Sequence, residues 1–155
     1  MRKLIEKELV LLDMALSTRD DVLTAVSDKA YALNFIKDKA AFIDGVLERE
    51  GLIPTSIGFK VAIPHVKSKV VNSPFVSFVR TTEAFRWDDR NDEDVDFIFL
   101  IAIPEVAESN LHLRFLSAIS RKLVDEEFRN SLRNAKTSTE AYDILQAINK
   151  AIIGA

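Results

Sequence analysis

Two histidines, His65 and His112, and an arginine, Arg49, are the residues of this chain best suited to chemistry. His65 follows an apolar run that ends in Pro64, so we expect a strand to stop there and present the imidazole at its end. A neutral imidazole is a nucleophile at physiological pH. A guanidinium and a second imidazole can donate hydrogen bonds to the oxygens of a phosphoryl group. If the three side chains converge, they suit phosphoryl transfer through a histidine.

Both supporting residues are expected near helix ends. A helix predicted from Asp38 ends near Arg49-Glu50-Gly51, where glycine is a natural stop. His112 falls on the inward-facing stripe of a helix whose predicted N-cap is Ser109. The positive partial charge at the start of that helix favours an anion beside the imidazole.

The elements that must position these residues alternate between strands and helices, which predicts an α/β fold with a mixed sheet in a single domain over residues 1–155. Strands are predicted at residues 9–12, 61–63, 75–79 and 95–103. Helices are predicted at residues 17–35, 38–51, 109–124 and 125–134, and after a capping box at 137–140. Residues 52–60 and the acidic segment 88–94 are predicted to be loops.

Composition excludes several classes of function. The 155 residues are 48% hydrophobic and 29% charged, as in ordinary globular proteins. A net charge of −3, without a clustered basic excess, does not indicate nucleic-acid binding. The absence of cysteine excludes disulfides and thiolate chemistry. The apolar run near the N-terminus is too short to span a bilayer, so we expect no membrane insertion and a cytoplasmic location.

The chain resembles the enzyme IIA proteins of the fructose–mannitol class in the bacterial sugar phosphotransferase system. The resemblance covers nearly the whole chain, and its elements are specific in combination rather than singly. They are Arg49-Glu50, Pro54-Thr55-Ser56-Ile57-Gly58, Val61-Ala62-Ile63-Pro64-His65, the strand DVDFIFLIAIP and Leu111-His112-Leu113.

The resemblance implies a mixed, mostly parallel sheet of five strands flanked by helices. It implies that His65 accepts a phosphoryl group from phosphorylated HPr and passes it to a IIB component, while His112 and Arg49 support the group. It requires neither a metal nor a cofactor. Glu50 either orients Arg49 or is solvated, and Thr55 either hydrogen-bonds His65 or shapes a turn.

The chain also departs from the pattern of this family, which usually has glycines on both sides of its active histidine. The positions concerned hold Ser56, Phe59, Lys60 and Val66. Loss of glycine restricts the backbone conformations available there. Lys60 and Lys67 add positive charge, which partly compensates for this loss. A regulatory module that acts through protein contacts, or a degenerate module that kept only the fold, therefore stays open as an alternative.

Other uses of these residues carry less weight. A zinc site would need a third ligand from Asp or Glu, and the chain has no His-x-x-x-His spacing. Phe85 and Trp87 are predicted to be packing residues, and the segment 88–96 is predicted to be solvated.

Overall fold

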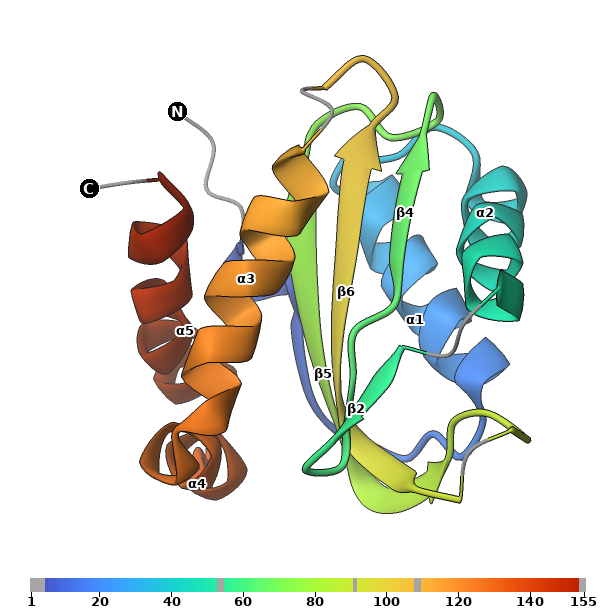
Figure 1. Ribbon diagram of the computed structural model, residues 1–155. Helices are drawn as coiled ribbons and strands as arrows, with labels where there is room; N and C mark the ends of the chain where they lie inside the picture. Colours follow the sequence, from blue (N-terminus) through green and yellow to red (C-terminus); the bar gives the residue numbers. More distant parts are fainter. Residues whose placement is uncertain (1–4, 53–54, 91, 108–109, 154–155) are drawn as a thin grey trace.

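A mixed β-sheet with helices on both faces forms the body of the molecule (Figure 1). The computed structural model describes residues 5–52, 55–90, 92–107 and 110–153. The predicted N-cap Ser109 lies outside them. In chain order the elements are η1 (Lys7–Leu9), β1 (Val10–Met14), α1 (Arg19–Ala32), α2 (Lys39–Leu52), β2 (Ser56–Gly58), β3 (Val61–Ala62), β4 (His65–Ser68), β5 (Phe75–Arg86), β6 (Asp94–Pro104), α3 (Leu111–Val124), α4 (Glu126–Asn134) and α5 (Ser138–Ile153).

The sheet has the order β1-β5-β6-β3-β2, and β4 also pairs with β6. Strand β1 is parallel to β5, and β3 and β4 are parallel to β6. The pairs β5–β6 and β2–β3 are antiparallel. The predicted α/β class with a mixed, mostly parallel sheet is confirmed.

One interruption in the sheet places His65. Strands β3 and β4 lie end to end along β6, where Val61 pairs with Phe97 and His65 pairs with Ile101 in an unbroken register. Pro64 separates the two strands because it has no N–H for the ladder, although its carbonyl still accepts from the Ile101 N–H at 2.9 Å. The prediction that a strand stops before His65 is confirmed, since β3 ends at Ala62, but His65 also opens a second strand in the same register. This break gives the sheet six strands, although β3 and β4 share one position beside β6.

The two faces of the sheet hold separate apolar cores. Helices α1 and α2 cover one face, with Val22, Leu23 and Phe42 fully buried beneath them. Helices α3, α4 and α5 cover the other, where Phe115 and Leu145 are fully buried (Figure 1). Strand β6 is buried over nearly its whole length, as expected for a strand covered on both faces. Among the described residues, no helix is long and apolar enough to cross a membrane.

Local signals explain where helix α1 starts and stops. The Thr18 hydroxyl accepts from the Asp21 N–H at 3.0 Å and caps the start of the helix. The helix ends at Ala32, before the predicted end at residue 35, because Asn34 adopts a φ of 65°. The Phe35 N–H then reaches back to the Ala30 carbonyl at 2.8 Å, which closes a Schellman motif.

Other predicted boundaries need adjustment. Residues 52–60 are not simply a loop, because α2 extends to Leu52 and the short strand β2 follows. Strand β5 continues to Arg86, well beyond the predicted end at residue 79. Before α5, the Thr137 hydroxyl accepts from the Glu140 N–H at 3.1 Å, as predicted. The Glu140 carboxylate binds the N–H of Lys136 rather than that of Thr137.

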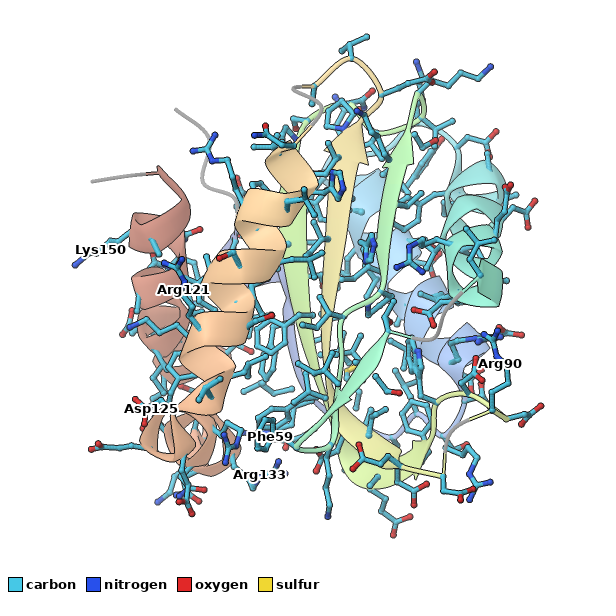
Figure 2. All side chains as sticks on the ribbon, viewed as in Figure 1. Phe59, Arg90, Arg121, Asp125, Arg133 and Lys150 are labelled. Atoms are coloured by element: carbon cyan, nitrogen blue, oxygen red, sulfur yellow. The ribbon has the colours of Figure 1, made fainter. Side chains whose placement is uncertain are left out.

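A tight hairpin joins β2 to β3 through Phe59 and Lys60. Their φ angles are 58° and 64°, which is the left-handed region for two residues that are not glycine. The Phe59 ring lies beside α4, with the Arg129 guanidinium 4.0 Å from its centroid (Figure 2). This cation–π contact anchors a strained turn to the opposite layer of the molecule.

Candidate active site

Three elements bring the predicted chemical residues together at one depression. Arg49 comes from the last turn of α2, His65 from the start of β4 and His112 from the first turn of α3. Figure 1 shows β4 between these two helices. The Nε of Arg49 donates to Nε2 of His65 at 3.0 Å. The two imidazole rings lie nearly parallel, with centroids 6.4 Å apart and an angle of 18° between the planes. The depression has a volume of about 790 Å³ and all three residues line it.

The hydrogen bonds of His65 define which ring nitrogen is available. Nδ1 lies 3.1 Å from the Ile63 carbonyl, which can only accept, so Nδ1 carries the proton. Arg49 can only donate, so Nε2 is unprotonated and its lone pair accepts the bond from Arg49. Backbone and guanidinium together select one neutral tautomer, with the proton on Nδ1 and Nε2 unprotonated.

The surroundings also keep this imidazole uncharged. Burial lowers the pKa of His65 below its ordinary value of 6.5, and the hydrogen bond to Ile63 opposes that effect. The nearby charges of Arg49 and His112 lower the pKa further, whereas Glu50 raises it. At neutral pH His65 is therefore predominantly in the form that can attack an electrophile.

His112 completes the depression with an unused polar atom. It is half-buried, and its Nδ1 is shielded from solvent without a hydrogen-bond partner within the described part of the chain. A buried ring nitrogen without a partner is costly in a folded protein. The imidazole itself lines the depression beside His65.

The rest of the lining is mixed in character. Lys67 and Lys69 contribute positive charge, and Leu52, 73% exposed, provides an apolar rim. Lys67 thus lines the depression, whereas Lys60 lies in the β2–β3 turn. The lining also includes three carboxylates, those of Asp44, Glu48 and Glu105. Within the described residues, no group of three His, Cys, Asp or Glu side chains could hold a metal ion.

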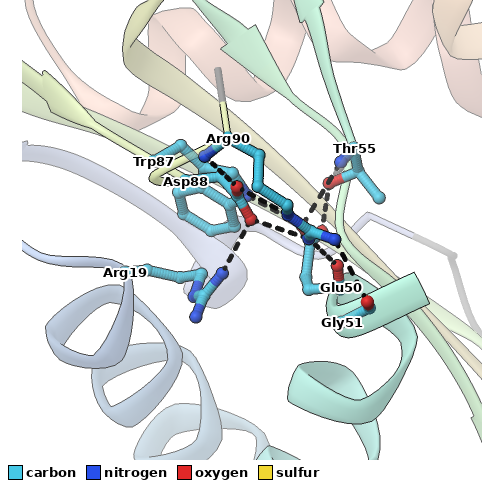
Figure 3. A network of polar contacts seen from close by, with 7 residues as sticks. All are labelled: Arg19, Glu50, Gly51, Thr55, Trp87, Asp88 and Arg90. Carbon is cyan, nitrogen blue, oxygen red and sulfur yellow. Dashed lines mark hydrogen bonds and ion pairs between the residues drawn. The ribbon is translucent and has the colours of Figure 1, made fainter. Parts of the chain in front are cut away.

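Glu50 and Thr55 are bonded to each other next to the last turn of α2, which carries Arg49. Glu50 is fully buried, which excludes the alternative that it is solvated. Its carboxylate accepts from the Thr55 N–H at 3.2 Å, from the Thr55 hydroxyl and from the indole Nε1 of Trp87 at 3.2 Å (Figure 3). Thr55 therefore shapes the connection after α2. Trp87 and Phe85 are buried, as predicted. The hydrogen bond from Trp87 to Glu50 was not predicted.

The acidic segment after β5 is less solvated than predicted. Asp88 is only 7% exposed and binds the Arg90 guanidinium through both carboxylate oxygens at 3.0 Å (Figure 3). It also lies 3.4 Å from the guanidinium of Arg19. The hydrogen bonds from Arg90 lower the pKa of Asp88 from 3.8 to about 2, against the opposing effect of burial. The sequence signal for this pair was the spacing Asp88-x-Arg90, which is too common to predict it.

A mixed α/β sandwich that presents a half-buried, neutral histidine bound by an arginine defines a class of small histidine-presenting α/β proteins. The family model for "Phosphoenolpyruvate-dependent sugar phosphotransferase system, EIIA 2" matches residues 3–148, and the chain belongs to this family.

Individual relatives agree with this assignment. The chain is 33% identical over 141 residues to the fructose-specific EIIA component of Haloferax volcanii, a match that covers 91% of both chains. Other relatives are longer, and the chain spans 22% and 20% of the EIIABC components of Escherichia coli and Bacillus subtilis that it matches.

Solved structures share the fold. The nitrogen regulatory protein IIA-Ntr from Neisseria meningitidis superposes with a TM-score of 0.83 at 25% identity, over 92% of this chain and 96% of that one. Enzyme IIA for mannitol from Escherichia coli, in its complex with phosphorylated enzyme IIB, gives a TM-score of 0.77 at 19% identity, over 92% and 99% of the two chains.

Proposed function

We propose that this protein is a cytoplasmic phosphocarrier of the sugar phosphotransferase system. His65 takes a phosphoryl group from phosphorylated HPr and passes it to a IIB component. The observation that carries the proposal is the pair of hydrogen bonds on His65, which leaves Nε2 as a neutral nucleophile beside a guanidinium.

The step needs no external acid or base. The Nε2 lone pair attacks phosphorus, while the bond between phosphorus and the donor histidine breaks and its electron pair returns to the donor nitrogen. The proton on Nδ1 stays with His65 and remains hydrogen-bonded to the Ile63 carbonyl. Transfer to IIB repeats the displacement, with Nε2 as the leaving atom.

Catalysis then depends on positioning and on charge stabilisation. Arg49 is already in hydrogen-bond contact with the reacting nitrogen, so a small movement brings its guanidinium onto the phosphoryl oxygens. His112 offers a second donor from the start of α3. The open depression suits a group that must be received from one protein and surrendered to another.

The test is incubation with enzyme I, HPr and labelled phosphoenolpyruvate, followed by addition of IIB from the same organism. We expect the wild-type protein to take up label and then lose it to IIB. His65→Ala should take up none, and His112→Ala should take it up more slowly. Uptake of label by His65→Ala at the wild-type level, or retention of label in the presence of IIB, would refute the proposal.

A further inference from the structure

The helix turn that holds Arg49 is weak by its own sequence. Helix α2 ends at Leu52, so the carbonyls of Glu50 and Gly51 lie in its last turn, where intrahelical donors run out. The donor for Glu50 would come from position 54, and Pro54 has no N–H. The donor for Gly51 would be the Thr55 N–H, which is instead given to the Glu50 carboxylate. Gly51 itself lowers the stability of this turn by roughly 1 kcal/mol relative to alanine.

Arg90, from the loop after β5, supplies the missing donors. Its Nη2 donates to the Glu50 carbonyl at 2.5 Å and its Nη1 donates to the Gly51 carbonyl at 3.1 Å (Figure 3). A cation at this end of a helix is also favoured by the helix dipole. The two carbonyls that follow Arg49 directly in the chain are thereby tied to a segment distant in sequence.

Asp88 holds Arg90 in the orientation that this contact requires. The Asp88 carboxylate accepts from Nε and from Nη2 of Arg90, each at 3.0 Å, and from its backbone N–H at 2.7 Å. The Arg90 guanidinium is thus clamped between a carboxylate and a helix end. Next to it, the Trp87 indole donates to the Glu50 carboxylate. Residues 87–90 therefore hydrogen-bond to both the backbone and a side chain of the last turn of α2.

We propose that Arg90, held by Asp88, is a positioning residue that keeps the Arg49 guanidinium on Nε2 of His65. The consequence for phosphoryl transfer rests on the function proposed above. Arg90 does not line the depression that contains His65, so it acts through α2 and not on the phosphoryl group. Its side chain is 47% exposed, whereas that of its partner Asp88 is only 5% exposed. The pair therefore contributes to global stability as well as to the position of α2, and the test reads the position of Arg49 directly in folded protein.

The experiment compares Arg90→Ala with Arg86→Ala in the full chain. Arg86 is a matched control because it is 52% exposed and interacts only weakly with Asp92 at 3.8 Å, in the same region of the molecule. Nuclear magnetic resonance of the unphosphorylated protein reports the exchange of the Arg49 Nε–H with water and the ring nitrogen signals of His65. Steady-state phosphorylation by phosphorylated HPr gives kcat and KM.

In Arg90→Ala we expect the Arg49 Nε–H to exchange with water markedly faster, and kcat to fall roughly 10-fold, since small displacements of a catalytic group are costly. KM should stay unchanged, and Arg86→Ala should match the wild type in every measurement. Arg90→Lys, which can reach one carbonyl but cannot form the two-pronged contact with Asp88, should lie between the wild type and Arg90→Ala.

Wild-type values of exchange and kcat in a folded Arg90→Ala would overturn the proposal, as would equal losses in Arg90→Ala and Arg86→Ala. If Arg90→Ala does not fold, Asp88→Asn decides by the same measurements, because it keeps Arg90 but removes the charge that orients it. Failure of the wild type to take up label would refute the proposed function alone, because the resonance measurements still report the position of Arg49.

Discussion

A Cβ atom added to Gly45 would lie 2.9 Å from Cγ2 of Val66. Gly45 lies one helical turn before Arg49 on α2, and Val66 directly follows His65 on β4. The glycine lets the helix approach the strand closely, and the valine fills the space that remains. The distance between Arg49 and His65 therefore depends on the fit of this neighbouring pair. The bulky residue after His65, a departure from the glycine usual in the family, is accommodated by a glycine on the facing helix.

Gly45→Ala should push α2 away from β4. Overpacking of this kind costs roughly 1–3 kcal/mol, which exceeds the gain of about 1 kcal/mol from replacing a helical glycine. We expect a lower free energy of unfolding in urea and slower phosphorylation of His65. Gly51→Ala is the matched control, because nothing lies within 4 Å of its added Cβ, and it should stabilise the protein.

The double variant Gly45→Ala, Val66→Ala tests the cause. Removing the two methyl groups of the valine relieves the clash, so the double variant should recover phosphorylation rate relative to Gly45→Ala. Additive losses in the two single variants would instead mean that Gly45 and Val66 act independently.

The phosphorylation of His65 should depend on pH through its own imidazole. Burial lowers the pKa of this group below 6.5, with further lowering by Arg49 and His112. The initial rate should therefore be constant above pH 6.5 and fall only at lower pH, with an apparent pKa below that value. The free energy of unfolding should fall as the pH drops from about 6.5 toward that lower pKa, because the unfolded chain takes up a proton there that the folded protein does not. A rate that halves above pH 6.5 would contradict this assignment.

Replacing Arg49 with Gln should separate its two effects on His65. Loss of the positive charge removes one cause of the lowered pKa, so the pKa of His65 should rise in a titration followed by nuclear magnetic resonance. Loss of the guanidinium should also slow phosphoryl transfer, by roughly 10²-fold to 10³-fold if it acts like other donors to a developing negative charge. Arg49→Lys should keep the lowered pKa but not the full rate. An unchanged pKa in Arg49→Gln would contradict the Coulombic role.

Much of the fold followed from local patterns, and its exceptions have local causes. The continuous apolar run of β6 correctly indicated a strand covered on both faces. The β2–β3 hairpin escaped prediction because Phe59-Lys60 lacks the Asn-Gly signature of such turns. Pro64 correctly marked a break in the strand, but only the shared pairing with β6 shows that the strand resumes at His65.

The residues of the candidate site could be predicted from the sequence, but the contacts that hold them in place could not. His65, His112 and Arg49 could be named from motifs, although their convergence depends on packing between α2, β4 and α3. The contact of Arg90 with the carbonyls of Glu50 and Gly51 joins segments about 40 residues apart, and no local pattern encodes such a contact. An acidic segment predicts solvation, yet Asp88 is buried by its own ion pairs.

Arg80 should be a major contributor to stability. Its buried guanidinium donates to the carbonyls of Leu132 and Ala135 at 2.8 Å each, at the end of α4. Arg80→Met would leave these buried acceptors unpaired, at roughly 1–3 kcal/mol each. We expect a loss of about 3 kcal/mol in the free energy of unfolding, measured with urea. Asp13→Asn is the control: the Asp13 side chain, 2.9 Å from Arg80, is 66% exposed, so its charge should contribute less than about 1 kcal/mol.

The turn at Lys60 should be improvable by a single substitution. Lys60 has a φ of 64°, a conformation that costs a residue with a Cβ about 1 kcal/mol and costs glycine almost nothing. Lys60→Gly removes that strain but gives the unfolded chain more freedom, which offsets part of the gain. We expect a net increase of roughly 0.5 kcal/mol in the free energy of unfolding. Lys136→Gly, at an exposed loop position outside the left-handed region, incurs only the entropic loss and should destabilise the protein. The opposite signs of the two lysine substitutions would identify backbone strain as the cause, and a destabilised Lys60→Gly would contradict it.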